Sequence, residues 1–200
     1  MKFLAFSDTH EDYNILRKLI KRAKKDDIEF VLVGGDFTEF ERGMHKALKE
    51  LQQIGKPVYV IPGNHEEGDL YKEAIKKYPN CINVDRSDLD LHSHVLLSYG
   101  GDGFSLEDPD FRNISRSWYG KHKDRKIILF LHGPPFATKL DYLDHLERHV
   151  GNKDYRKFIE RIQPQLVICG HLHETAGMVD EIGTSKVVSP QWEGMVIELP

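Results

Sequence analysis

The sequence predicts a protein of the mixed α/β class, in which crossover helices join parallel strands. Within residues 1–77, three short apolar runs of strand type alternate with three amphipathic segments of helical period. This order favours parallel strands, because each helix carries the chain back to the starting edge of the sheet. A length of 200 residues is enough for a domain with a sizeable core, and we predict that residues 1–200 form one domain.

The elements of the first part follow from the spacing of its apolar residues. The expected strands are 2–6, 28–33 and 57–61, and the expected helices are 13–25, 42–54 and 69–77. In the first helix, the apolar residues recur every three or four positions and leave a basic opposite face. We interpret that basic face as solvated rather than as a contact for nucleic acid.

The second part changes character, because short strands follow one another without helices between them. The expected strands are 82–84, 89–91, 95–99, 126–131, 166–170, 179–182, 186–188 and 194–199. The first three predict antiparallel pairing or a second sheet, and residues 179–188 predict a hairpin around Gly183. A helix is expected at 154–162, and a short helix or a lid within 105–123. Residues 136–152 are a long connection, which is uncommon unless it is functional.

Composition and charge exclude several classes of protein. The formal net charge of −4 provides no global basic field for nucleic acid or an anionic membrane. No apolar run approaches the roughly 18 residues of a membrane span, and the apolar start at 2–6 is too short for a signal sequence. Cys81 and Cys169 lie far apart, in or beside apolar runs, which indicates reduced, buried thiols in a cytoplasmic protein.

Potential metal ligands follow five of the predicted strands. They are Asp8 and His10, then Asp36, then Asn64 and His65, then His132, and finally His171 and His173. In open α/β sheets, ligands gather at the carboxyl ends of the strands, where the loops converge. A single strand that ends in a histidine means little, but five in an alternating chain indicate a shared site. The final two histidines can splay onto neighbouring points, as a pair of metal ions requires.

These blocks resemble those of the calcineurin-like metallophosphoesterase superfamily. That family's pattern runs D-x-H, G-D, G-N-H-[DE], a strand ending in His, then G-H-x-H, and residues 8–173 contain every block in this order. Residues 148–151, Arg-His-Val-Gly, are also similar to small prokaryotic members of phosphodiesterase type. Two departures occur, neither of which removes a ligand. Leu131 replaces the common Gly before His132, and residues 189–191 read Ser-Pro-Gln instead of Asn-Pro-Gly.

The resemblance implies a four-layer α/β/β/α sandwich of the metallo-dependent phosphatase type that holds two divalent ions. The first ion would be bound by Asp8, His10, Asp36 and His173, and the second by Asp36, Asn64, His132 and His171. Asp36 would bridge the ions, and His65 would stand beside them without binding either. A mixed set of imidazole, carboxylate and amide ligands favours Mn, Fe, Zn, Co or Ni, of which Mn is our first choice.

The implied activity is hydrolysis of phosphodiesters, with phosphomonoesters as a further substrate class, by attack of a metal-bridging hydroxide. Two divalent ions, two carboxylates and one hydroxide leave about one positive charge, which attracts a phosphate oxygen. The pKa of a metal-bound water falls to about 7, so a nucleophile exists at neutral pH. His65 would assist the leaving oxygen, a role worth about 10²–10⁴-fold in rate. The predicted catalytic residues are therefore His65 and Asp36.

Other function classes stay open at this point. The same fold serves as a catalytically silent protein-interaction scaffold in a retromer subunit, but every ligand position and His65 are intact here. A nuclease is disfavoured by the negative net charge and by the lack of an added DNA-binding domain. We therefore expect a small phosphoester as substrate, no membrane partner and nucleic acid only as a less favoured substrate. A homodimer stays open.

The remaining polar residues receive less specific predictions. Arg148 and His149 are predicted substrate contacts, because their loop precedes the start of a helix, where anions bind. Glu66 is expected to orient a neighbour rather than to bind metal. Asp102 and Asp108 are interpreted as loop acids that face solvent. Five further histidines are expected at the surface, namely His45, His92, His94, His122 and His145.

Overall fold

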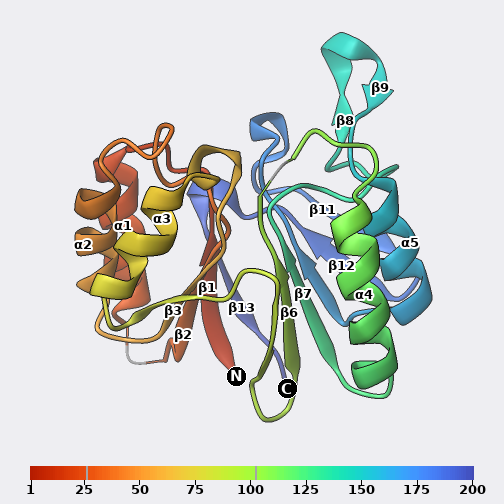
Figure 1. Ribbon diagram of the computed structural model, residues 1–200, viewed down its shortest axis with the longest axis horizontal. Coiled ribbons are helices and arrows are strands. Elements are labelled where there is room, and N and C mark those ends of the chain that lie inside the picture. The colour runs from red at the N-terminus through yellow and green to blue at the C-terminus, as the bar shows by residue number, and fades with distance from the viewer. Residues whose placement is uncertain (26, 102) are drawn as a thin grey trace.

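Two large β-sheets pack face to face, and helices cover the outer face of each (Figure 1). The computed structural model describes residues 1–25, 27–101 and 103–200, so Asp102 lies outside the described residues. Among the helices of these ranges, none combines the length and the apolar composition needed to cross a membrane.

The first sheet is formed mainly by the N-terminal part of the chain. Its strand order is β13 (Met195–Glu198), β1 (Lys2–Phe6), β2 (Phe30–Val33), β3 (Val58–Val60) and β4 (Cys81–Asn83). The neighbours from β1 to β4 are parallel, and β13 pairs antiparallel with β1. The helices on its outer face are α1 (Tyr13–Ala23), α2 (Met44–Gln52) and α3 (Asp69–Ala74). The expectation of antiparallel pairing or a second sheet was therefore wrong for 82–84, which extends the first sheet in parallel.

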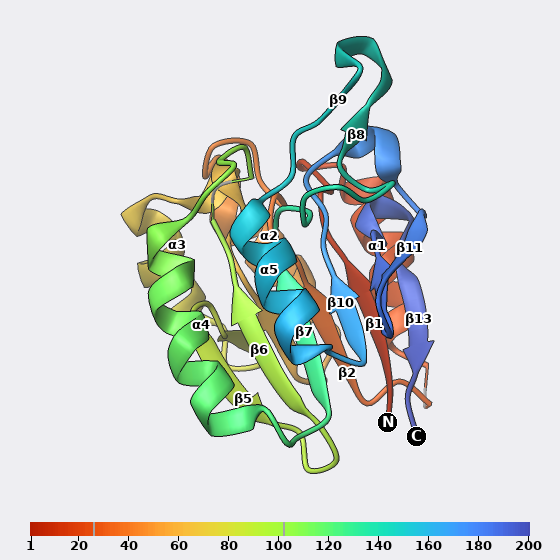
Figure 2. The same ribbon diagram turned by 90° about the vertical axis from the view of Figure 1, so that its right-hand side faces the viewer.

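The second sheet is formed by the C-terminal part of the chain. Its strand order is β11 (Val179–Ile182), β12 (Ser185–Val188), β10 (Leu166–Ile168), β7 (Ile127–Leu131), β6 (Val95–Tyr99) and β5 (Ser87–Asp90). The four central strands are parallel, and both edge strands pair antiparallel. The helices on its outer face are α4 (Pro109–His122) and α5 (Lys153–Ile162) (Figure 2). The predicted hairpin at 179–188 is confirmed, and the segment 105–123 contains a full helix.

Strands β2, β6, β7 and β10 are buried on both faces, which explains why they read as continuous apolar runs. In β1, Leu4 and Phe6 pack with the helices, whereas Phe3 and Ala5 face the other sheet. Phe130 of β7 meets them in the core between the sheets. Because side chains alternate along a strand, one apolar run supplies two cores. The result is the predicted α/β/β/α order of layers (Figure 1).

Side-chain caps fix where the long helices begin. The Asp12 carboxylate accepts hydrogen bonds from the first backbone N–H groups of α1. Asp108 does the same for α4, with Pro109 at its first position, and Asn152 does so for α5. Such caps satisfy donors that have no partner within the helix. Asp108, expected as a loop acid, is therefore a helix cap.

Short elements complete the chain. The 3₁₀ helices are η1 (Asn64–Glu66), η2 (Ile75–Lys77), η3 (Asp144–Leu146), η4 (His173–Thr175) and η5 (Gln191–Glu193). Strands β8 (Tyr142–Leu143) and β9 (Arg148–His149) form a two-stranded hairpin, which we call the arm. The arm lies within the long predicted connection 136–152 and projects at the carboxyl ends of the parallel strands (Figures 1 and 2).

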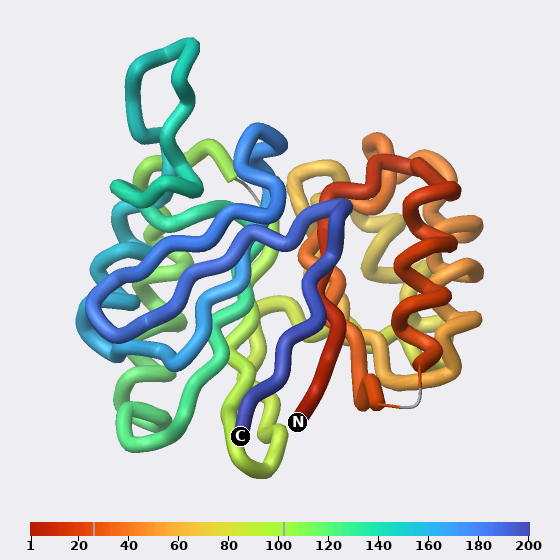
Figure 3. The backbone as a smooth tube through the Cα atoms, turned by 180° about the vertical axis from the view of Figure 1, so that it is seen from behind, coloured from red at the N-terminus to blue at the C-terminus, as the bar shows by residue number. Residues whose placement is uncertain are grey.

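The N- and C-termini lie side by side at the opposite end of the sheets (Figure 3). There the Met1 ammonium donates a hydrogen bond to the Leu199 carbonyl at 2.7 Å. Cys81 and Cys169 are free and buried, as predicted. Burial raises the pKa of the Cys81 thiol to about 12, which keeps it unreactive at neutral pH.

Candidate metal centre

The predicted ligands converge where five parallel strands end. Among the described residues, three groups of side chains have ligand atoms that lie within 4.8 Å of one another, and one of them comprises His10, Glu39 and His65. We call Asp8, His10 and His173 the outer cluster, and Asp36, His132 and His171 the inner cluster. These residues follow β1, β2, β7 and β10, so that both sheets contribute to the site. Residues more than 160 positions apart in the chain therefore become neighbours.

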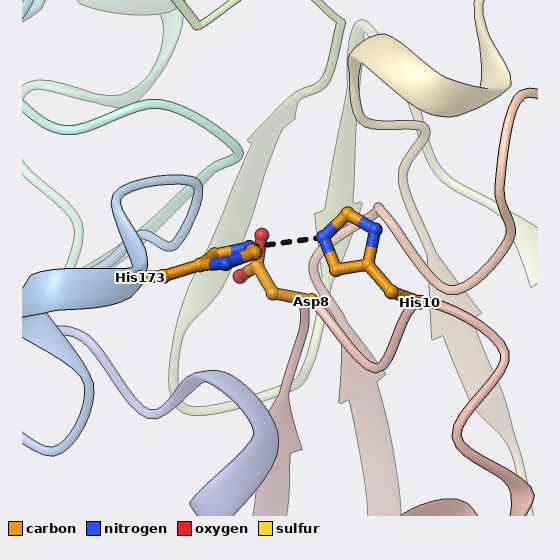
Figure 4. Close-up of side chains that lie close together, drawn as sticks. All are labelled: Asp8, His10 and His173. Atoms are coloured by element: carbon orange, nitrogen blue, oxygen red, sulfur yellow. Dashed lines mark hydrogen bonds between the residues drawn. The ribbon is translucent and has the colours of Figure 1, made fainter.

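In the outer cluster, two imidazole nitrogens face each other over a carboxylate (Figure 4). The Nε2 atoms of His10 and His173 are 2.9 Å apart, and Asp8 lies beside them. The Asp8 carboxylate accepts hydrogen bonds from the Ser7 hydroxyl and from the His171 backbone N–H. Burial raises the pKa of Asp8, although the charge of His132 opposes this rise. Such converging lone pairs are suited to a cation.

In the inner cluster, a backbone carbonyl fixes the orientation of His132. Its Nδ1–H donates to the Gly34 carbonyl at 2.8 Å, and its Nε2 faces Asn64 Oδ1 at 3.1 Å and Asp36 Oδ2 at 3.4 Å. An imidazole held in this way presents Nε2 as a ligand atom.

The pairing of His132 with Asp36 shifts the pKa of both groups. Burial lowers the pKa of His132, but the charge and hydrogen bonding of Asp36, the charge of Asp8 and the Gly34 carbonyl together raise it to about 9. The pKa of Asp36 falls below its ordinary value despite its burial, because His132 charge and hydrogen bonding favour the carboxylate. A metal ion bound here would displace the imidazole proton.

Asp36 lies between the two clusters. Its Oδ2 is 3.4 Å from the Nε2 of His132 and 4.0 Å from the Nε2 of His10, while its Oδ1 accepts from the His65 backbone N–H at 3.0 Å. One carboxylate oxygen therefore faces both clusters, which is the position that a shared ligand needs. Asn64 lies on the inner side, through its contact with His132.

Glu66 joins two of the loops that carry these residues. Its buried carboxylate accepts hydrogen bonds from the backbone N–H groups of Asp36 at 2.7 Å, Thr38 at 2.8 Å and Gly63 at 3.0 Å. Burial and the charge of Asp36 raise its pKa to about 7. Glu66 belongs to neither cluster, and its contacts position the loop that holds Asp36.

Several of the candidate ligands adopt a left-handed backbone conformation. The φ angles are 53° at Asp8, 39° at His10, 49° at Asp36 and 73° at His171. Non-glycine residues rarely occupy this region, at a cost of about 1–3 kcal/mol each, and such residues cluster at functional sites. The turns aim the side chains back across the strand ends. Gly63 must lack a side chain, because a β-carbon there would overlap the Asp36 carboxylate.

The donor set fits two divalent transition metals. Imidazole nitrogens and carboxylate oxygens predominate, which suits Mn, Fe, Zn, Co or Ni better than Ca. Two clusters that share a carboxylate also agree with a pair of ions about 3.5–4 Å apart.

Glu39 is a functional candidate that the sequence did not single out. Its Oε1 is 3.0 Å from the Nδ1 of His10, and its Oε2 is 3.5 Å from the Nδ1 of His65. One carboxylate thus orients two imidazoles, and His65 lies outside both clusters with its ring against His10, at a centroid distance of 4.7 Å. In the sequence, Glu39 is marked only as an acidic residue shortly after Asp36. Glu41 has the same property, so the sequence alone does not show which of the two faces the site.

Exposed aromatic rings surround the site. Phe40 and Phe104 are 72% and 66% exposed, an unusual exposure for phenylalanine. Phe40 stacks on His65, with centroids 4.2 Å apart, and Phe104 packs edge-on against His171 at 4.2 Å. Trp192 meets the ring of His173 at 5.3 Å. Three histidines of the site therefore each have an aromatic neighbour.

Arg148 and His149, the predicted substrate contacts, lie on the arm and in neither cluster. Arg148 is exposed. The Nδ1 of His149 donates to the buried Asp141 carboxylate at 2.8 Å. Their part in substrate binding stays a prediction.

Two of the five histidines expected at the surface are buried, so that expectation was wrong for His94 and His122. The ring nitrogens of His94 are hydrogen-bonded to Ser93 and to Gln165, and His122 contacts Asp88 at 2.5 Å. Partners of this kind remove the cost of burying a polar ring. The other three, His45, His92 and His145, are exposed as predicted.

Known proteins resemble this chain in sequence. The sequence model of the calcineurin-like phosphoesterase family matches residues 1–175. A probable glycerophosphodiester phosphodiesterase, GpdQ of Arcobacter nitrofigilis, is 24% identical over 82% of this chain and 63% of its own length. A probable cyclic nucleotide phosphodiesterase of Rhodopseudomonas palustris is 24% identical over 86% of this chain and 72% of its own length. The chain thus spans less than two thirds of the first relative.

Solved structures share the fold. TT1561 of Thermus thermophilus superposes with a TM-score of 0.76 at 18% identity, covering 95% of this chain and 88% of that protein. A dimetal phosphatase from Danio rerio gives a TM-score of 0.61 at 12% identity, covering 94% and 86%. At such identities, the likeness concerns the fold alone.

Proposed function

The chain belongs to the calcineurin-like phosphoesterase family, and from this premise we propose that it is a metal-dependent phosphoric ester hydrolase acting on phosphodiesters. The observation that carries the proposal is the position of the Asp36 Oδ2 atom between the two clusters, 3.4 Å from the Nε2 of His132 and 4.0 Å from the Nε2 of His10. Two relatives with phosphodiesterase names support the preference for diesters. Phosphomonoesters remain a further substrate class.

Two divalent ions are part of the proposal, with Mn as the first choice. Asp8, His10, Asp36 and His173 would hold one ion, and Asp36, Asn64, His132 and His171 would hold the other. When bound, the ions would supply a nucleophile from water at neutral pH and would neutralise charge on the phosphate.

The protein's own residues orient the reacting groups. The contact of Asp36 Oδ2 with both clusters fixes the spacing of the ligands. His65 gives a proton or a hydrogen bond to the leaving oxygen as the phosphorus–oxygen bond breaks. The Oε2 atom of Glu39 lies 3.5 Å from the Nδ1 of His65, so its negative charge faces this side of the ring and the other ring nitrogen, Nε2, lies on the opposite side. The reaction needs no covalent intermediate on the chain.

The proposal also covers the domain organisation, cellular location and partners of the chain. A continuous core between the two sheets supports one domain over residues 1–200. The cytoplasmic location, the small phosphoester substrate and a homodimer stay predictions. The intact ligand positions disfavour a silent scaffold, and the net charge of −4 disfavours a nuclease.

The test is metal-dependent turnover of a substrate panel. Chelator-stripped protein is reloaded with Mn²⁺ and assayed on bis(p-nitrophenyl) phosphate, p-nitrophenyl phosphate, cyclic nucleotides, a phosphoprotein and single-stranded DNA. We expect diester cleavage that requires the metal and is fastest on a small diester. Bound metal without turnover would indicate a scaffold, and DNA cleavage with a steep salt dependence would indicate a nuclease.

A further inference from the structure

The arm and the loop after the last histidine block line an open cavity of about 680 Å³. Glu174 and Thr175 line this cavity and directly follow His173 of the outer cluster. Consecutive Cα atoms are about 3.8 Å apart, so the cavity begins next to the metal centre. The arm rises beside this loop in both views (Figures 1 and 2). A group attached to a phosphate at the clusters can therefore reach it.

One wall of the cavity carries a histidine whose orientation is fixed from behind. The Nδ1 of His149 donates to the Asp141 carboxylate at 2.8 Å, and Asp141 is fully buried. The same carboxylate accepts from the backbone N–H groups of Ala137, Thr138 and Gly151 at 2.7–3.0 Å. This network holds the base of the arm together. It leaves the Nε2 of His149 on the side away from Asp141, in a ring that lines the cavity.

The other lining groups indicate what the cavity accepts. Carboxylates outnumber cations, with Asp144, Glu174 and Asp180 against Lys139, and the exposed faces of Tyr142 and Met178 add apolar surface. Three carboxylates repel a second phosphate but accept hydrogen bonds from hydroxyl or amino groups. A cavity of this volume falls within the roughly 300–1,000 Å³ typical of sites for organic ligands.

The position of His65 indicates which of the two alcohol groups of a phosphodiester lies in the cavity. His65 packs against His10 and Phe40, whereas the described residues that line the cavity fall within 137–149 and 174–180. The alcohol whose oxygen His65 assists therefore departs on the Phe40 side. The second alcohol of a diester, which stays bonded to phosphorus, points toward the arm.

Resting on the proposed phosphodiesterase function, we propose that this cavity binds the retained alcohol of the substrate. The alcohol is an uncharged or cationic, hydroxyl-bearing group of nucleoside size with an apolar face. His149 contacts it through Nε2, Tyr142 packs against it, and Asp141 is a positioning residue that holds the His149 ring. The cavity thus determines which diesters are cleaved well.

The test compares two diesters with the same leaving group, using the Mn²⁺-loaded protein. They are the p-nitrophenyl ester of thymidine 5′-monophosphate and methyl p-nitrophenyl phosphate, which differ only in the retained alcohol. We expect the wild type to favour the thymidyl ester in kcat/KM by about tenfold or more. We expect Tyr142→Ala and His149→Asn each to reduce this ratio by about tenfold, the worth of one well-made contact.

His149→Asn separates binding from folding. Asparagine retains an N–H that can donate to Asp141 in place of Nδ1 but has no counterpart of Nε2. A purely structural role for His149 predicts an unchanged ratio in this variant, whereas the proposal predicts a raised KM for the thymidyl ester. Thymidine 5′-monophosphate should also inhibit the variant about tenfold more weakly. His92→Asn, at an exposed histidine outside the site, is the matched control and should keep both rates.

The possible failures are distinct. Equal kcat/KM for both esters in the wild type, or an unchanged ratio in both variants, would overturn the cavity assignment and leave the phosphodiesterase proposal standing. Failure of the metal-loaded wild type to cleave either ester would overturn the proposed function and this inference with it.

Discussion

The outer and inner clusters use the same residue types but differ in how deeply they are buried. All three inner residues are buried, and His132 is fully so, whereas His10 is half-buried and His173 exposed. The distance from the end of the strand explains the difference. His132 follows Leu131 of β7 directly, but His173 lies in η4, beyond the turn that follows β10. A ligand that follows a buried strand within a few residues therefore stays buried.

This difference gives the two clusters separate physical tasks. The inner cluster is held by protein contacts even without a cation, since His132 is hydrogen-bonded to Gly34 and paired with Asp36. In the outer cluster, the Nε2 atoms of His10 and His173 face each other at 2.9 Å, and both rings are more exposed than that of His132. We therefore expect the inner ion to be retained and the outer ion to exchange with solvent.

The largest effect is expected at Asp36, whose carboxylate lies between the two clusters and is proposed to serve both. Asp36→Asn removes the charge that faces His10 and His132, so both ions should bind weakly. We expect kcat/KM to fall by about 10²–10³-fold or more, as when a charge-stabilising group is lost. Metal analysis after gel filtration should find fewer than two ions per chain. Full metal content with wild-type turnover would show that Asp36 is not shared.

A pair of alanine variants tests the two clusters separately. In the metal-free protein, His132→Ala leaves the buried Asp36 carboxylate without its partner and should destabilise the fold by about 3–5 kcal/mol. His173→Ala, at an exposed position, should change stability by no more than about 0.5 kcal/mol. Chemical denaturation measures both.

The same pair should differ in metal content after chelator treatment. His132→Ala should retain no ion, because it lacks an inner ligand and its outer ion exchanges, whereas His173→Ala should retain the inner ion. Titration with a chelator followed by elemental analysis distinguishes these outcomes. Equal losses in both variants would mean that burial does not separate the clusters.

His65 lies beside the outer cluster and belongs to neither, so its removal should affect chemistry alone. His65→Ala should lower kcat on phenyl phosphodiesters by about 10²–10⁴-fold, the usual worth of a general acid. Both ions should stay bound, because His65 contributes only a backbone N–H to Asp36. The loss should be smaller with p-nitrophenyl esters, whose leaving group needs little protonation. Unchanged turnover on phenyl esters would contradict the assigned role.

The parts of the fold that depend on local periodicity could be predicted from the sequence. The alternation of apolar strands and amphipathic helices gave the α/β class, and Leu16, Leu19 and Ile20 of the α1 stripe are buried as expected. The strand-end ligands were also predictable, because a residue that follows a parallel strand must lie at one edge of the sheet. The ligand blocks between residues 8 and 173 can thus be assigned to one site from the sequence alone.

The parts that depend on distant partners could not be predicted. Residues 81–83 join β3 in parallel because of pairing that no local pattern encodes. His94 is buried because Gln165, 71 positions away, receives its hydrogen bond. Glu39 has no motif of its own, and its importance arises only when His10 and His65 lie on either side of it. Positive φ angles at non-glycine ligands likewise give no sequence signal.

The smallest effect is expected at Phe40, the exposed ring that stacks on His65. This prediction tests whether Phe40 orients His65 beside the outer cluster. Phe40 is 72% exposed and stacks on His65 at an interplanar angle of 21°. Such a pair is worth about 0.5–1.5 kcal/mol, so Phe40→Ala should lower kcat on phenyl esters by roughly 2- to 10-fold. Phe104→Ala is the matched control, because Phe104 contacts His171 of the inner cluster. If Phe40 orients His65, the rate of Phe40→Ala should depend more steeply on the pKa of the leaving group than the wild-type rate does, and that of Phe104→Ala should not. An equal dependence in both variants would mean that Phe40 covers the imidazole without orienting it.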